Sequence, residues 1–64
     1  MAITMKAARV NAGLTQKQAA EALEISKNTL VNYETGKTIP RADVARKMAA
    51  LYGLAVSDII FFAN

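Results

Sequence analysis

Residues 16–36 of this 64-residue chain read QKQAAEALEISKNTLVNYETG, and this stretch decides the fold. Two runs of good helix formers flank residues 23–25, a connection too short for an antiparallel hairpin with long arms. Ala20 is small enough to let a second helix approach, and Leu30 can fill the angle between the two helices. The stretch therefore predicts two short helices that cross steeply around a tight turn.

The rest of the chain divides into further helices, because good helix formers dominate it and alternation of β-branched residues is absent. Thr15 and Ser26 are suitable N-caps, and Gln18 completes a capping box with Thr15. Three glycines follow helical runs at places where a left-handed residue can end a helix: Gly13, Gly36 and Gly53. The five helices predicted are Ile3–Ala12, Gln16–Leu23, Lys27–Thr35, Ala42–Tyr52 and Val56–Phe62. We expect one all-α domain over residues 1–64, a compact five-helix bundle.

The predicted core follows from helical periodicity. On the fourth helix one apolar stripe faces away from Asp43, Arg46 and Lys47, and its members are Val44, Ala45, Met48, Leu51 and Tyr52. The other helices are expected to add Met5, Ala8, Leu14, Ala20, Leu23, Ile25, Leu30, Leu54 and Ile59.

Composition excludes several classes of function. The chain has no cysteine and no histidine, and its five carboxylates have no spacing that suggests a metal cage or an acid–base pair. We therefore expect no enzyme activity, no metal and no cofactor. The formal charge of +3 fits a polyanionic partner without establishing one. No apolar run could span a bilayer and no signal peptide is recognisable, so we expect no membrane association and a cytoplasmic location.

The third predicted helix splits into two faces at 100° per residue. Leu30 and Tyr33 point toward the body of the domain. The outward residues are of types that can contact base edges in DNA: Lys27, Asn28, Val31 and Asn32. Taken alone, the same pattern also fits an ordinary solvated face with one stray valine.

A series of spaced residues between Arg9 and Leu54 decides between these interpretations, and the resemblance that it carries covers about residues 3–61. It consists of Arg9, residues 13–16 (GLTQ), Ala19, Ala20, Ile25, Ser26, Thr29, Leu30, Tyr33, Glu34, Gly36, Lys37, Pro40 and residues 51–54 (LYGL). In this series the chain resembles the phage repressor/Cro-type (XRE-like) helix-turn-helix DNA-binding family. The resemblance implies a lambda-repressor-like fold in a bacterial or phage-encoded protein, whose third helix enters the DNA major groove.

The resemblance also implies roles for individual residues. Base edges would be read by Lys27, Asn28, Val31 and Asn32. The DNA backbone would be held by Thr15, Gln16, Ser26, Thr35, Lys37 and Arg41. Arg9 and Glu34 match an ion pair that ties the first helix to the end of the third, and we expect its role to be structural.

Three positions depart from the family pattern. Glu24 stands where the turn usually has glycine, and a left-handed glutamate costs about 1 kcal/mol, so we expect a slightly altered turn. Arg41 and Ala55 stand where capping residues are common. These departures affect local geometry and leave the DNA-reading residues in place.

The function expected is that of a sequence-specific DNA-binding transcriptional regulator, most simply a repressor. Since one small module makes few phosphate contacts, we expect a homodimer on a palindromic operator, with half-sites about one helical turn apart. An apolar tail is a candidate dimer patch: Ile60, Phe61 and Phe62. Phe62 folding back onto the core is an equally good alternative. A different class of function with the same fold is an antitoxin-like protein-interaction module.

Overall fold

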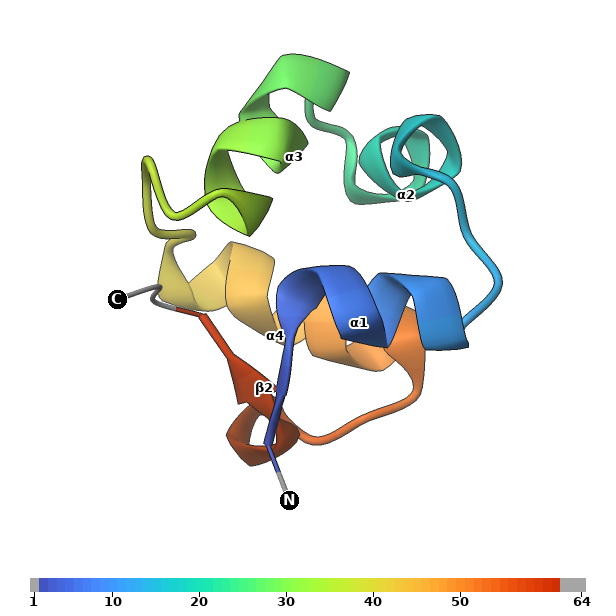
Figure 1. Cartoon of the computed structure of the whole chain (residues 1–64), viewed down its shortest axis with the longest axis vertical. Coiled ribbons are helices and arrows are strands. Elements are labelled where there is room, and N and C mark those ends of the chain that lie inside the picture. The colour runs from blue at the N-terminus through green and yellow to red at the C-terminus, as the bar shows by residue number, and fades with distance from the viewer. Residues whose placement is uncertain (1, 62–64) are drawn as a thin grey trace.

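Four α-helices make up most of residues 2–61, the part of the chain that this computed structural model describes. In chain order the elements are β1 (Ile3–Thr4), α1 (Met5–Asn11), α2 (Gln16–Leu23), α3 (Lys27–Glu34), α4 (Ala42–Tyr52), the 3₁₀ turn η1 (Val56–Asp58) and β2 (Ile59–Ile60). α2 and α3 form one side of the molecule, and α1 and α4 lie side by side beneath them (Figure 1). The helix-turn-helix therefore stands on a base made by the other two helices.

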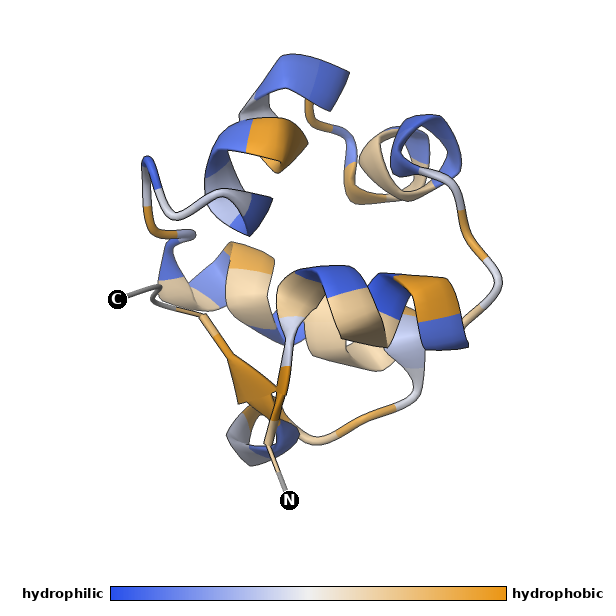
Figure 2. Ribbon diagram, viewed as in Figure 1, coloured by the Kyte–Doolittle hydropathy of each residue, from blue (hydrophilic) through white to orange (hydrophobic). Residues whose placement is uncertain are grey.

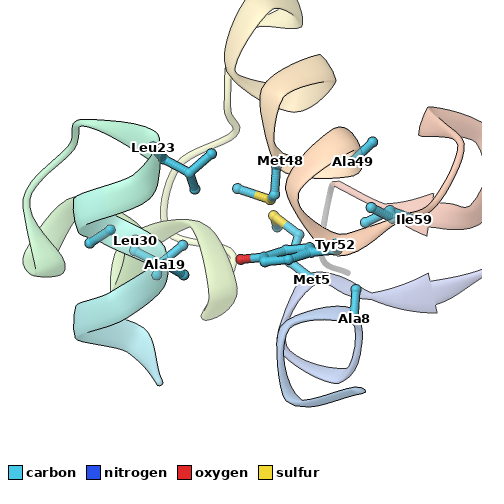
Figure 3. Packing of buried hydrophobic residues seen from close by; sticks show 10 residues of the cluster. Met5, Ala8, Ala19, Leu23, Leu30, Met48, Ala49, Tyr52 and Ile59 are labelled. Atoms are coloured by element: carbon cyan, nitrogen blue, oxygen red, sulfur yellow. The ribbon is translucent and has the colours of Figure 1, made fainter. Parts of the chain in front are cut away.

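The core lies where these helices meet (Figure 3). Leu30 of α3 and Met48 of α4 are its largest fully buried side chains. Alanines form much of the rest, which allows short helices to pack closely in a small domain. The buried apolar residues are Met5, Ala8, Ala19, Ala20, Leu23, Leu30, Ala45, Met48, Ala49, Tyr52 and Ile59. The predicted residues outside this set, which are Leu14, Ile25, Val44, Leu51 and Leu54, are partly buried against it.

The outer surface is mostly polar (Figure 2). The first turn of α3 is hydrophilic and points away from the core, whereas Leu30, one turn later, points into it. Within residues 2–61, none of the helices combines the length and the apolar character needed to cross a membrane.

Each helix ends in the same backbone arrangement, with one residue in the left-handed region. After α3, the N–H of Lys37 donates to the carbonyl of Asn32 at 2.9 Å, and the N–H of Gly36 donates to Tyr33 at 3.2 Å. This 6→1 and 5→2 pair is a Schellman motif, which satisfies carbonyls that the helix leaves open. The left-handed role predicted for the glycines is confirmed at Gly13, Gly36 and Gly53, where φ is 77°, 82° and 73°.

The α2–α3 turn uses the same motif without glycine. Glu24 has φ 60° and ψ 39°, and the N–H of Ile25 donates to the carbonyl of Ala20 at 3.0 Å. The expectation that glutamate would alter this turn is wrong, because the residue accepts the left-handed conformation. The bond from Ile25 and the burial of Leu23 outweigh the local strain.

The two chain ends correct the sequence prediction. Ile3–Thr4 is a short strand that pairs in parallel with Ile59–Ile60, with Ile3 opposite Ile59. The first helix therefore begins at Met5, after Thr4 caps it by accepting the N–H of Ala7 at 3.1 Å. The fifth helix predicted over Val56–Phe62 is wrong: within its described part, one 3₁₀ turn leads into β2. The chain thus has four α-helices and a two-stranded sheet over residues 2–61, in place of a five-helix bundle.

Between the chain ends, the predicted bounds of α2 and α4 match the structure, and α3 ends one residue earlier than predicted, at Glu34. The Thr15–Gln18 capping box is confirmed, with bonds of 2.9 and 3.1 Å. Arg41 makes no side-chain cap for α4 within the described residues, as expected. Ala55 cannot cap η1 with its side chain, but its N–H donates to the Asp58 carboxylate at 3.2 Å.

Replacing Glu24 with glycine should stabilise the domain. Glycine adopts φ 60° without the steric cost of a Cβ atom, and Glu24 is exposed, so no packing is lost. We expect E24G to raise the free energy of unfolding by about 1 kcal/mol, measured by urea denaturation. Gly53→Ala, at a left-handed position with open space around a new Cβ, is the matched control and should destabilise. Equal or lower stability of E24G would contradict the strain assigned to this turn.

Candidate nucleic-acid interface

The turn between α2 and α3 is held by buried apolar residues on both sides. Leu23 at the end of α2 and Leu30 within α3 are buried, and Ile25 between them is partly buried against the same cluster. Ala20 is 2% exposed at the point where the two helices approach. The turn is therefore fixed by packing, and α3 has a defined direction relative to α2.

The orientation of α3 agrees with its sequence pattern. Leu30 is fully buried and Tyr33 packs against the core. Lys27 and Asn28, at the start of the helix, are exposed, whereas Val31 and Asn32 are half-buried. Ser26 caps the helix by accepting the N–H of Thr29 at 3.0 Å. The structure thus presents an ammonium group and an amide at the outer end of α3, with a valine and a second amide further along.

Two helix N-termini, those of α2 and α3, offer backbone donors. Thr15 and Ser26 each accept one N–H of the helix that they cap. The N–H groups of residues 16–17 and 27–28 have no acceptor among the described residues. Open N–H groups at a helix N-terminus, together with the helix dipole, favour an anion such as phosphate.

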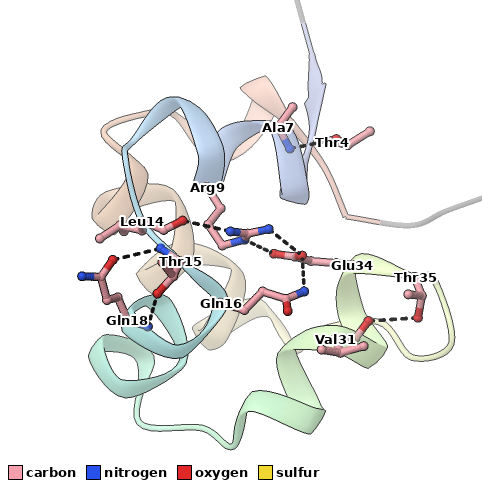
Figure 4. A network of polar contacts seen from close by, with 10 residues as sticks. All are labelled: Thr4, Ala7, Arg9, Leu14, Thr15, Gln16, Gln18, Val31, Glu34 and Thr35. Carbon is pink, nitrogen blue, oxygen red and sulfur yellow. Dashed lines mark hydrogen bonds and ion pairs between the residues drawn. The ribbon is translucent and has the colours of Figure 1, made fainter.

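A polar network joins α1, α2 and α3 (Figure 4). Arg9 of α1 donates through Nε to Oε2 of Glu34 at 2.7 Å and through Nη2 to Oε1 at 3.3 Å. Its Nη1 donates to the carbonyl of Leu14 at 2.9 Å. The side chain of Gln16, the first residue of α2, donates through Nε2 to Oε1 of Glu34 at 3.1 Å. The Arg9 and Glu34 side chains are 9% and 3% exposed, so the ion pair is buried.

The loop after α3 carries the remaining predicted backbone contacts. Lys37 and Arg41 are exposed, so both cations are free to meet a phosphate group. Thr35 is different: its hydroxyl donates to the carbonyl of Val31 at 2.9 Å, and its backbone N–H donates to the same carbonyl at 2.9 Å. Because both donors of Thr35 are used within the protein, its hydroxyl would have to rotate before it could donate to DNA.

Comparison with known proteins matches this geometry to a family. The sequence model of the family described as "Helix-turn-helix" matches residues 5–59, which include all four α-helices. The chain belongs to the helix-turn-helix family of the phage repressor/Cro type. Two helices that cross around a tight turn are the defining unit of that family.

Three relatives are transcriptional regulators by name. The chain is 41% identical over 56 residues to the HTH-type transcriptional regulator ImmR of Bacillus subtilis, and 31% identical over 52 residues to the cryptic phage CTXphi transcriptional repressor RstR of Vibrio cholerae. These matches cover 88% and 81% of this chain but 44% and 47% of the relatives, so the chain spans about half their length. An uncharacterized HTH-type transcriptional regulator of Methanocaldococcus jannaschii is 33% identical over 80% of this chain and 77% of its own length.

Several features of this helix-turn-helix domain were not predicted from the sequence. The bond between Gln16 and Glu34 joins residues 18 positions apart, and no local pattern signals it. The hydroxyls of Thr29 and Ser26 share a hydrogen bond of 2.8 Å. The position of Thr29, three residues after the N-cap Ser26, was a sequence signal for this bond. Ile39, in the loop with Lys37, is 60% exposed, and its position in a polar turn could have drawn attention to it.

The candidate dimer patch is only partly described. Ile60 is 40% exposed on β2, whereas Phe61 is partly buried against the core. In a strand, successive side chains alternate between faces, which explains why Ile59 is buried and Ile60 is not. The premise of a helical tail is therefore wrong, and Phe62 lies outside the described residues.

Tyr52 of α4 extends its hydroxyl from the core toward α2 and α3 (Figure 3). The side chain is buried, and the hydroxyl has no hydrogen-bond partner among the described residues. Burial raises the pKa of Tyr52 to about 12; the Glu34 carboxylate adds to the rise and the Arg9 guanidinium opposes it. The Tyr52 phenol therefore stays neutral in the folded chain at pH values where an ordinary tyrosine ionises.

Replacing Tyr52 with phenylalanine should stabilise the domain by about 1 kcal/mol at pH 7, because it removes a buried group that lacks a partner. A second difference should emerge at high pH. In the unfolded chain the phenol ionises near pH 10, whereas in the folded chain it resists ionisation until about pH 12. The wild type should therefore lose stability relative to Y52F between pH 10 and pH 12. Urea denaturation at pH 7, 10 and 11.5 tests both effects, and a Y52F variant less stable at pH 7 would contradict them.

Proposed function

We propose that this chain is the DNA-binding domain of a transcriptional regulator, most simply a repressor, and that α3 enters the major groove. The observation that carries the proposal is the exposed polar start of α3, whose direction is fixed by the apolar residues packed on both sides of the turn before it. The family match and the names of the three relatives support the same function.

We assign sequence reading to one face of α3. Asn28 and Asn32 can each form a paired hydrogen bond with the N6 and N7 atoms of adenine, and Lys27 can donate to O6 and N7 of guanine. Val31 lies between them and fits contact with a thymine methyl group. Because Asn32 and Val31 are half-buried, their side chains have less freedom than those of Lys27 and Asn28.

We assign contacts with the DNA backbone to the elements around α3. Gln16 and the open N–H groups at the start of α2 fit one phosphate, with Thr15 beside them. Ser26 and the start of α3 fit a second position, and Lys37 and Arg41 fit phosphates beyond the far end of α3. We keep the predicted backbone contact from Thr35 on the condition that its hydroxyl rotates away from the carbonyl of Val31 and donates to a phosphate.

We further propose a homodimer on an inverted repeat with half-sites about one helical turn apart. One domain offers few cations near α3, so two copies would be needed for tight binding at physiological salt. The support for a surface of association is that Val56 and Ile60, near the C-terminal strand, are 43% and 40% exposed.

Selection of bound sequences from a random DNA pool tests the function and the symmetry together. A palindromic consensus is the expected result, and a single asymmetric site would contradict the dimer. Binding to the selected duplex should weaken steeply with salt, by a log–log slope of about −0.9 for each phosphate neutralised. No binding to any DNA at low salt would overturn the proposal and favour a protein-interaction module of the same fold.

Two substitutions separate base reading from backbone contact. Asn32→Ala should lower affinity by about 1–3 kcal/mol for the selected sequence and relax the preference at one base position. Lys37→Ala should weaken binding to all sequences about equally and reduce the salt slope by about 1. Lys47→Ala, which removes an exposed lysine of α4, is the control for charge alone. An Asn32→Ala variant with an unchanged preferred sequence would contradict the orientation assigned to α3.

A further inference from the structure

The Glu34 carboxylate accepts a hydrogen bond from Gln16 in addition to those from its ion-pair partner, Arg9. Arg9 donates to both of its oxygens, at 2.7 and 3.3 Å, and Gln16 adds a third bond of 3.1 Å to Oε1 (Figure 4). Gln16 is the first residue of α2, where the open N–H groups also lie. A buried anion is thus connected directly to the side chain to which the proposed function assigns a DNA phosphate at the start of α2.

Glu34 determines which end of the Gln16 carboxamide faces it. A carboxylate only accepts hydrogen bonds, so the NH₂ group of Gln16 must point toward it. The flipped carboxamide would bring Oε1 against Oε1 of Glu34, which is repulsive and forms no hydrogen bond. One hydrogen of Nε2 is then used by Glu34, and the second remains available to a phosphate oxygen.

We propose that Glu34 is a positioning residue for DNA binding: it fixes the Gln16 carboxamide so that an N–H, and not an oxygen, meets the DNA phosphate. Arg9 makes this arrangement possible because its guanidinium neutralises the carboxylate. The proposal rests on the DNA-binding function proposed above. It gives Glu34 a favourable effect on DNA affinity even though its charge has the same sign as that of phosphate.

The direction in which Glu34→Gln changes DNA affinity distinguishes a positioning role from an effect of charge alone. Glu34→Gln removes one negative charge and raises the formal charge of the chain from +3 by one, which by itself strengthens binding to DNA. Glutamine can also donate to Oε1 of Gln16, so both orientations of the Gln16 carboxamide become possible. We expect E34Q to weaken binding by about 3- to 10-fold, the range for one side chain that must be ordered on binding.

A double-mutant cycle on the full chain tests the proposal by fluorescence anisotropy with the selected duplex. Gln16→Ala should weaken binding, and Glu34→Gln should weaken it when residue 16 is glutamine but not when it is alanine. Glu21→Gln, which removes an exposed carboxylate from α2, is the matched control for charge and should leave binding unchanged or slightly tighter. Equal losses from Glu34→Gln in both backgrounds would mean a structural role only and would overturn the proposal.

A measurement on the wild-type protein covers the case in which Glu34→Gln does not fold. In the NMR spectrum of the free protein, the side-chain NH₂ of Gln16 should exchange with water more slowly than that of exposed Gln18, and adding the duplex should shift it. Exchange as fast as that of Gln18 would overturn the proposal. If the wild type binds DNA with a steep salt dependence but shows neither slow exchange of the Gln16 NH₂ nor coupling between residues 16 and 34, only the role of Glu34 is overturned. If the wild type binds no DNA, the DNA-binding function itself is overturned.

Discussion

The buried ion pair between Arg9 and Glu34 is the interaction on which the arrangement of this domain depends. It joins α1 to the end of α3, and the same two side chains reach the carbonyl of Leu14 and the amide of Gln16. A buried ion pair adds little net stability, because removing two charges from water costs about as much as their attraction returns. Its contribution is direction: full satisfaction of both charged groups is possible only when α1, α2 and α3 stand in one relative position.

Core packing and the capping of helix ends also hold the helices in their relative positions. The core is built from alanines at the helix crossings and a few large side chains, so helices of seven to eleven residues can meet at short distance. Each α-helix is followed by a left-handed residue, which turns the chain sharply and lets backbone N–H groups satisfy carbonyls of the last turn. Such short helices are marginal in isolation, and tertiary packing supplies most of their stability. The position of the exposed start of α3 therefore depends on contacts made on the opposite face of the helix.

The sequence was informative wherever local chemistry decides local structure. The bounds of α2 follow from the Thr15 cap and the turn after Leu23, and those of α4 follow from its apolar stripe and Gly53. The chain ends were predicted wrongly, since a two-residue strand has no measurable periodicity and its partner lies at the other end of the chain. The β-branched pairs Ile3–Thr4 and Ile59–Ile60 were the available signal.

The site residues also divide into those whose placement local sequence predicts and those whose placement depends on contacts between helices. The inward direction of Leu30 and the outward direction of Lys27 follow from helical period alone. The link from Glu34 to Gln16 could not be predicted in this way, because it exists only once α2 and α3 have packed together. The Thr35 hydroxyl is a different case, because its bond to the carbonyl of Val31 joins residues four positions apart in one helix end and was therefore open to prediction from local sequence.

The most direct test of the central claim, that the α2–α3 unit presents one fixed surface to DNA, is an NMR titration of the wild-type chain with its selected duplex. The backbone amide signals that shift most should be those of residues 16–17, 27–32 and 37. Shifts concentrated instead on β1, β2 and the outer face of α4 would contradict the claim, because DNA would then be bound by a surface that α3 does not form.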